Sequence, residues 1–358
     1  MIQEYFLGGT SPNGFRSKFI RQIRRPGFYT YILKGGPGTG KSTLMKKAAE
    51  RFNDHELSLY RCSSDISSLD AVVVEDEGLI IVDGTAPHVF EAEYPGISQE
   101  IVNLGQFWNG SELKAHGDTV RYCFDENARY HKRVRNYVEA LSALNTDIFD
   151  HALDCLDTLK LDAYGERLAK KLTAKCQKGK TGKMQFRQLS AFTTENYMTL
   201  PVRQSCFSYF LRDDSFAGSD RLLRLLAESF TQSGYDVIVS ECPMLQCTTF
   251  EHLLVPELSL FFTTGNFFNR LKPDSESIIN FARFYDKERM EMKKQRMNFN
   301  KKAVMELADE AASSLSTALR IHDELERYYI NSIDFDGLGM MTQDLLHSIE
   351  EGMHGINT

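Results

Sequence analysis

Apolar positions near the start of the chain predict a strand followed directly by a helix. The segment "FYTYIL" (28–33) is aromatic and β-branched, which is typical of a buried strand. In "KSTLMKKAAERF" (41–52), Leu44, Ala48 and Phe52 recur at helical spacing. The short connection between the two segments is rich in glycine. This order of elements is the beginning of an α/β unit.

Further apolar runs extend this pattern. "LSLY" (57–60) and "GLIIVDG" (78–84) are short and bounded by turn residues, so each is expected to be a strand. Strands that alternate with helices favour an α/β fold with a mostly parallel sheet. In such a sheet the carboxyl ends of the strands face the ligand.

Two long stretches, residues 117–175 and 286–328, have a helical pattern. The second carries the strongly charged "DKERMEMKKQRMNFNKK". We expect each stretch to form a helical hairpin appended to its half of the chain, with the basic segment 175–185 as the linker between halves. The apolar stripe of the first stretch consists of Val134, Tyr137, Val138, Leu141, Leu144 and Ile148, continued by Leu153, Leu156 and Leu159.

Length and composition narrow the class of protein. A chain of 358 residues suits two domains, and 42% apolar with 25% charged residues is typical of a globular protein. A net charge of −7 argues against a general nucleic-acid binder. No apolar run is long enough to span a membrane, and the N-terminus lacks a signal pattern. The seven scattered cysteines form no CxxC pair, which favours reduced thiols and a cytoplasmic location.

The glycine-rich connection fits the Walker A pattern G-x-x-x-x-G-K-[ST], which binds nucleotide phosphates. Backbone N–H groups must approach the phosphates closely, and side chains would block that approach. The start of the following helix adds partial positive charge. Lys41 is expected to reach the β- and γ-phosphates of ATP and to act in catalysis, and the Ser42 hydroxyl to bind Mg²⁺. The expected nucleotide-binding residues are Gly35, Gly36, Pro37, Gly38, Thr39, Gly40, Lys41, Ser42 and Thr43.

An acidic residue at the end of a neighbouring strand should complete the Mg²⁺ site. Asp83 follows the apolar run that starts at Gly78, and we interpret it as the Walker B residue. Asp-Gly is also a common turn pair, so a simple turn is the alternative. His88 lies five residues later, either near the γ-phosphate or in a surface loop.

The segment "YRCSSDISSLD" (60–70) places polar residues at the end of another expected strand. Asp65 could orient a water molecule or an acceptor hydroxyl, which would make it catalytic. It could equally cap a helix, since Ser and Asp are favoured at that position. Ser63, Ser64 and Asp70 are expected at the same end of the strand.

The second half of the chain repeats the first. Residues 30–52 align with 208–230 at an offset of 178 without a gap, and seven of 23 positions are identical. Average composition would give about one or two identities. We therefore interpret the chain as a tandem duplication, with domains at 1–178 and 186–358. The match continues, with shifts, at Cys62 and Cys242, Leu79 and Leu260, "IVNLGQFW" (101–108) and "IINFARFY" (278–285), and "FLGGTSPNGF" (6–15) and "QLSAFTTENY" (188–197).

The second copy lacks the residues that the chemistry needs. Ser219 replaces Lys41, and Thr264 replaces Asp83. Asp213 and Asp214 stand where the first copy has glycines, and their charge should oppose a triphosphate. The apolar positions persist. This combination predicts a degenerate P-loop pseudo-domain that keeps the fold without the site.

These residues resemble a known family, the uncharacterised bacterial tandem P-loop ATPase-like proteins. The resemblance rests on "YILKGGPGTGKSTLMKK", "CSSDISSLDAVVV", "IIVDGTAPHVFEAEYPG" and "EIVNLGQFW", and covers essentially the whole chain. It implies two tandem P-loop NTPase domains and ATP as the nucleotide, but no substrate. In typical members the second half also keeps a glycine-rich loop with its lysine, and this chain departs there. The loop is also similar to that of nucleoside and nucleotide kinases.

The leading functional hypothesis is Mg²⁺-dependent ATP hydrolysis that drives a conformational switch. The alternatives are a kinase that transfers the γ-phosphate to a small-molecule or nucleotide acceptor, and a nucleotide-sensing protein with little turnover. A small-molecule acceptor or a protein is the expected partner besides the nucleotide, with no membrane. Arginines could bind an acceptor, namely Arg121, Arg129, Arg133 and Arg135, or act in trans on the phosphates, namely Arg212, Arg221 and Arg283.

Overall fold

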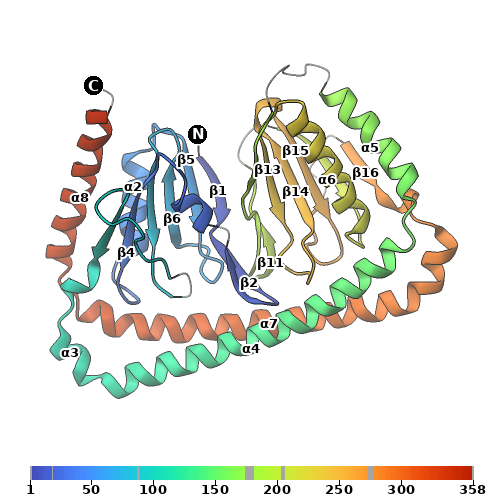
Figure 1. The fold of residues 1–358 in the computed structure, drawn as a ribbon. Helices are drawn as coiled ribbons and strands as arrows, with labels where there is room; N and C mark the ends of the chain where they lie inside the picture. The colour runs from blue at the N-terminus through green and yellow to red at the C-terminus, as the bar shows by residue number, and fades with distance from the viewer. Residues whose placement is uncertain are drawn as a thin grey trace. The chain divides into compact units, whose positions relative to one another are not determined.

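The computed structural model describes residues 2–17, 19–86, 89–173, 181–202, 206–272 and 277–356. Backbone contacts divide the chain into two units, each drawn around its own sheet in Figure 1. Unit 1 comprises Met1–Gly8, Ser17–Arg133 and Ser313–Thr358, and unit 2 comprises Gly9–Arg16 and Val134–Ala312.

Unit 1 is built on a six-stranded sheet. Five strands are parallel, and only β6 runs antiparallel to its neighbours β5 and β7. The expected strands at 28–33, 57–60 and 78–83 are confirmed as β4, β5 and β7, so the α/β class is confirmed for this unit. Along the sheet the strands are β1 (Ile2–Phe6), β5 (Leu57–Arg61), β6 (Leu69–Val74), β7 (Leu79–Asp83), β4 (Tyr29–Lys34) and β8 (Gln99–Asn103).

Unit 2 has a sheet with the same strand order and directions. Only β14 is antiparallel, as β6 is in unit 1. The register also corresponds, because Leu33 lies opposite Asp83 in unit 1 and Leu211 lies opposite Thr264 in unit 2. Its strands are β9 (Met184–Phe186), β13 (Val237–Glu241), β14 (Phe250–Val255), β15 (Leu260–Gly265), β12 (Phe207–Arg212) and β16 (Ser277–Asn280).

Smaller elements complete the chain. Strands β2 (Gly8–Ser11) and β3 (Gly14–Ser17) form one two-stranded sheet, and β10 (Ser190–Thr193) and β11 (Asn196–Thr199) form another. These two sheets fall on the segments 6–15 and 188–197 that the repeat matched. The short helices are α1 (Ile20–Ile23), α3 (Gly110–Ala115), and the 3-10 turns η1 (Leu104–Phe107), η2 (Pro256–Leu258) and η3 (Phe281–Phe284).

Each sheet is covered on one face by two helices that are far apart in sequence. In unit 1, α2 (Lys41–Arg51) and α8 (Phe335–Ile356) bury their apolar side chains in one core with β4, β5, β6 and β7. In unit 2, α6 (Ala217–Gln232) and α5 (Thr158–Leu172) do the same with β12, β13, β14 and β15. Burial of these apolar faces is the main source of stability in both units.

Two long helices exchange the closing elements between the halves of the chain. Helix α4 (Gly117–Leu153) begins in unit 1 and enters unit 2 at Val134. Helix α5 follows it in unit 2. Helix α7 (Lys287–Asn331) begins in unit 2 and passes into unit 1 at Ser313, where α8 follows it. The compact units therefore do not coincide with the halves 1–178 and 186–358 of the repeat.

Matching hydrogen bonds fix this exchange in both units. In unit 1, the Asn109 N–H donates to the Ser332 carbonyl at 2.7 Å. In unit 2, the Asp286 N–H donates to the Cys155 carbonyl at 2.8 Å. Both bonds join corresponding positions, offset by 177 residues. The expected hairpin at 286–328 is wrong, because the single helix α7 spans nearly all of this stretch. The expected helical stretch 117–175 forms α4 and α5. The helix that follows each long helix, α5 or α8, closes the unit formed by the strands of the other half.

Two further details of the helical prediction are wrong. Leu153 and Leu159 are 44% and 83% exposed, because α4 ends at Leu153 and α5 starts at Thr158 with a new orientation. The expected linker 175–185 ends inside β9, whose hydrogen bonds to β13 add a sixth strand to the sheet. Its residues 175–180 lie outside the described residues. Among the described helices, none is both long and apolar enough to cross a membrane.

Candidate functional site

The loop between β4 and α2 contains the glycines of the Walker A pattern. Gly38 and Gly40 adopt φ angles of +67° and +79°, which favour glycine. A Cβ on Gly35 would lie 2.6 Å from the Thr39 hydroxyl oxygen, so the turn is too tight for a side chain there. The glycines are required both by conformation and by space.

The start of α2 is open to an anion. Its N-cap is Gly40, which makes no side-chain capping bond, and its first turn contains no acidic residue. The first N–H groups of a helix have no acceptor within the helix. Most helices satisfy some of these groups with a capping side chain, whereas α2 has no such cap.

Lys41 holds the loop together. Its Nζ donates hydrogen bonds to the carbonyls of Gly35 at 3.0 Å and Gly36 at 2.7 Å. It also lies 3.7 Å from an Asp83 carboxylate oxygen, and both side chains are mostly buried. The structure thus brings together the expected lysine, at the start of the helix that follows β4, and the expected Walker B acid, at the end of the adjacent parallel strand β7.

A second carboxylate, Asp70, lies at the same edge of the sheet. It is 7% exposed at the start of the antiparallel strand β6. Burial and the nearby charge of Asp83 raise the pKa of Asp70 well above its ordinary value. Sequence analysis placed Asp70 at this edge but did not pair it with Asp83, because strand β6 was not predicted.

Ser42 and Asp83, the expected Mg²⁺ ligands, also have partners within the protein. The Ser42 hydroxyl oxygen accepts the Leu69 N–H at 3.0 Å. One Asp83 oxygen accepts the N–H of Thr85 at 2.8 Å and also its hydroxyl. The Asp-Gly turn and the Walker B interpretation are therefore compatible, since the turn fixes one oxygen and leaves the other facing Lys41.

Asp65 caps a turn in the β5–β6 loop. Its oxygens accept the N–H and hydroxyl of Ser67 and the hydroxyl of Ser68. Partial burial acts to raise the pKa of Asp65, but these hydrogen bonds outweigh it, and the pKa is lowered. The expected helix cap is wrong, because a turn and then β6 follow instead of a helix. A catalytic role for Asp65 stays a prediction. His88 lies outside the described residues.

The end of α7 covers the loop within unit 1. Tyr329 lies in aromatic contact with Trp108, 5.4 Å between ring centroids. A Cβ on Gly36 would lie 3.1 Å from Tyr329, and one on Gly38 would lie 3.0 Å from Ile330. Glu326 Oε1 accepts the N–H of Gly38 at 3.0 Å. Sequence analysis missed this contact, because nothing in the charged pattern of α7 distinguishes Glu326 from its neighbours.

In unit 2, the corresponding loop is filled by its own carboxylate. Asp213, 1% exposed, accepts the N–H groups of Ser215 at 3.1 Å and Ser219 at 2.8 Å. The Tyr285 hydroxyl donates to Asp213 as well and accepts the Gly218 N–H. Burial raises the pKa of Asp213 despite these hydrogen bonds. Phe216 keeps a φ of +66°, close to that of Gly38, which is unusual for a bulky residue.

The other distinctive residues of unit 2 also have structural partners. Asp220 pairs with Arg224 and accepts the Phe250 N–H at 2.7 Å. Arg221 forms a two-point ion pair with Asp162.

The other arginines considered for a role in catalysis or binding are paired, stacked or exposed. Of those considered in trans, Arg283 stacks on Tyr164 and Phe284, and Arg212 is exposed. Of those considered for an acceptor, Arg121 pairs with Asp118, Arg129 pairs with Glu126, Arg133 lies over Tyr130, and Arg135 is exposed.

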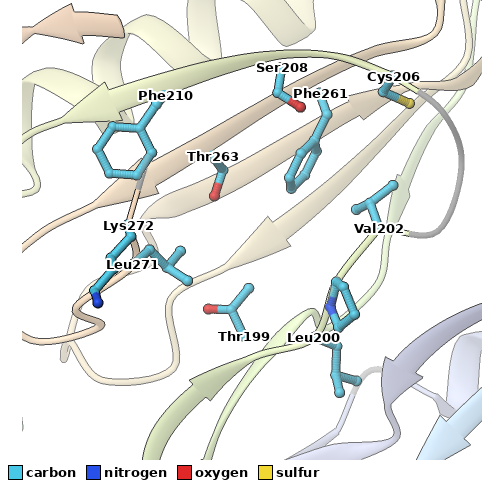
Figure 2. Close-up of a pocket in the computed structure, with 11 residues that line it drawn as sticks. Thr199, Leu200, Val202, Cys206, Ser208, Phe210, Phe261, Thr263, Leu271 and Lys272 are labelled. Atoms are coloured by element: carbon cyan, nitrogen blue, oxygen red, sulfur yellow. The ribbon is translucent and has the colours of Figure 1, made fainter. Parts of the chain in front are cut away.

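A pocket of about 300 Å³ lies on the sheet of unit 2 (Figure 2). The hydroxyl of Thr199 is hydrogen-bonded to Ser190, and the hydroxyl of Thr263 is hydrogen-bonded to His252. Two polar groups of the pocket are thus already used inside unit 2. The lining residues are Thr199, Leu200, Pro201, Val202, Cys206, Ser208, Phe210, Phe261, Thr263, Leu271 and Lys272.

Comparison with known proteins identifies no relative of this chain. No family model, curated protein or solved structure matches the chain. The site itself offers backbone N–H groups, one ammonium and two close carboxylates at the edge of a mostly parallel sheet.

Proposed function

We propose that unit 1 binds MgATP at residues 35–43 and hydrolyses it. One observation carries the proposal: a glycine-rich loop and an uncapped helix start lie beside an ammonium that is 3.7 Å from a carboxylate. Backbone N–H groups in this arrangement bind phosphate oxygens, and the helix dipole favours the negative charge. When ATP binds, the Lys41 ammonium would donate its hydrogen bonds to phosphate oxygens instead of to the loop carbonyls.

The residues present fit a magnesium ion as well. Ser42 offers a hydroxyl and Asp83 a carboxylate oxygen, which are ligands that Mg²⁺ accepts. Bound there, Mg²⁺ would neutralise negative charge on the phosphates. Asp70 would orient a water molecule or hold a proton beside Asp83, since its raised pKa favours the protonated form.

We propose that the chain arose by tandem duplication and that unit 2 is a degenerate P-loop domain. The shared strand order and the matched bonds at Asn109 and Asp286 support the duplication. Asp213 occupies the loop N–H groups in unit 2, and Ser219 offers no ammonium. A buried carboxylate would repel a phosphate there. These features agree with the tandem P-loop ATPase-like proteins, except for the second loop.

The test is phosphate release from MgATP by the full chain, with and without a panel of nucleosides and metabolites. We expect turnover that is independent of any acceptor and absent in Lys41→Ala. ADP formation that requires an acceptor would instead establish phosphoryl transfer. Binding without turnover would establish a nucleotide sensor.

A further inference from the structure

One hydrogen bond places an anion of the protein itself in the proposed phosphate cradle. Glu326 Oε1 accepts the Gly38 N–H at 3.0 Å. Gly38 lies at the centre of the loop and has a φ of +67°. Such N–H groups are the donors that a phosphate would use. A carboxylate oxygen is the side-chain group most similar to a phosphate oxygen in charge and hydrogen bonding.

Unit 2 has a carboxylate in the corresponding loop, but it is held differently. Asp213 belongs to the loop, is 1% exposed, and receives hydrogen bonds from Ser215, Ser219 and Tyr285. Glu326 belongs to a separate helix, and its side chain is 34% exposed. The anion of unit 2 belongs to its own loop, whereas the anion of unit 1 comes from another helix, where Glu326 Oε1 also lies 4.0 Å from His322 Nδ1.

We infer that Glu326 competes with the phosphates of the nucleotide for the cradle and must be displaced for ATP to bind. This inference rests on the proposed function of unit 1. Two acceptors cannot share the Gly38 N–H at full strength, and a carboxylate next to a phosphate adds like-charge repulsion. The apparent affinity for nucleotide is then reduced by the fraction of molecules in which Glu326 occupies the loop.

Helix α7, which carries Glu326, has residues in both units. Helix α7 begins at Lys287 in unit 2 and reaches the loop only after Ser313. Close contacts of Tyr329 and Ile330 with Gly36 and Gly38 place the helix directly against the loop backbone. Release of Glu326 by a nucleotide therefore changes the contacts of a helix that continues into unit 2.

The test uses Glu326→Gln in the full chain, with Glu324→Gln as the matched control. Both changes remove one negative charge from the same helix, and Glu324 is exposed. Binding of MgADP is measured by calorimetry for wild type and both variants, and adenosine serves as a ligand without phosphates. Thermal unfolding confirms that each variant is folded.

We expect Glu326→Gln to bind MgADP about tenfold more tightly, which corresponds to about 1.4 kcal/mol, because the neutral amide is a weaker acceptor for the Gly38 N–H and does not repel the phosphates. Glu324→Gln should match wild type, and adenosine should not distinguish the variants. Equal or weaker MgADP binding by Glu326→Gln, with clear binding by wild type, would overturn the inference alone. Absence of MgADP binding in all three proteins would overturn the proposed function, and the inference with it.

Discussion

Asp83→Asn is expected to lower MgATP turnover by at least about a hundredfold, because a neutral amide cannot support the charge of a bound magnesium ion in the transition state. Nucleotide binding should remain largely intact, since the glycine loop and Lys41 supply it. The substitution preserves shape, and the amide oxygen can still accept the Thr85 N–H. Phosphate release and nucleotide affinity, measured on the same preparation, separate the two effects.

The control for this prediction is Asp54→Asn, which removes the same charge from a side chain that is 80% exposed. Its turnover should equal that of wild type. Near-normal turnover in Asp83→Asn would show that Asp83 does not support the metal. Asp70, the buried neighbour of Asp83, would then become the carboxylate to replace.

Residues 1–180 expressed alone are expected not to form a stable domain. Three apolar side chains from α8, those of Leu338, Leu346 and Ile349, are buried in the core of unit 1 and would be missing. Each contributes about 1.5 to 3 kcal/mol when buried. Their sum of about 5 to 9 kcal/mol is comparable with the whole stability of a domain, about 5 to 15 kcal/mol.

The fragment would also expose the face of α5 that unit 2 normally covers. Leu161 is buried in the core of unit 2 together with Leu222 and Leu226. Co-expression with residues 181–358 should restore both units, and the two fragments should purify together with the turnover of the full chain. A soluble, monomeric 1–180 with cooperative unfolding and full turnover would contradict the exchanged arrangement.

Local sequence was sufficient for the elements that form the candidate site. Strand β4, the glycine loop and α2 are each specified by residues within about one turn or strand of one another. The sequence also contains an indication, not used above, that the segment of β6 runs antiparallel to that of β7. Only residues 75–78 separate β6 from β7, whereas parallel strands need a crossover of about a dozen residues or more.

The exchange of the closing helices α5 and α8 between the halves could not be derived from periodicity. The stripe from Val134 to Ile148 shows which face of α4 is buried, but many apolar surfaces could cover it. The length of α4, 37 residues or about 55 Å, is a weaker sign that it does not simply fold back on its own half. The contact of Glu326 with Gly38 depends entirely on this exchange, so it was beyond reach of the sequence.

In the proposed arrangement, unit 1 binds the nucleotide phosphates and Asp213 fills the corresponding loop of unit 2. Calorimetric titration of the full chain with a non-hydrolysable MgATP analogue counts the sites. We expect one site per chain in wild type and none in Lys41→Ala. Two sites per chain would contradict the degenerate state of unit 2, and absence of binding to wild type would contradict the nucleotide site itself.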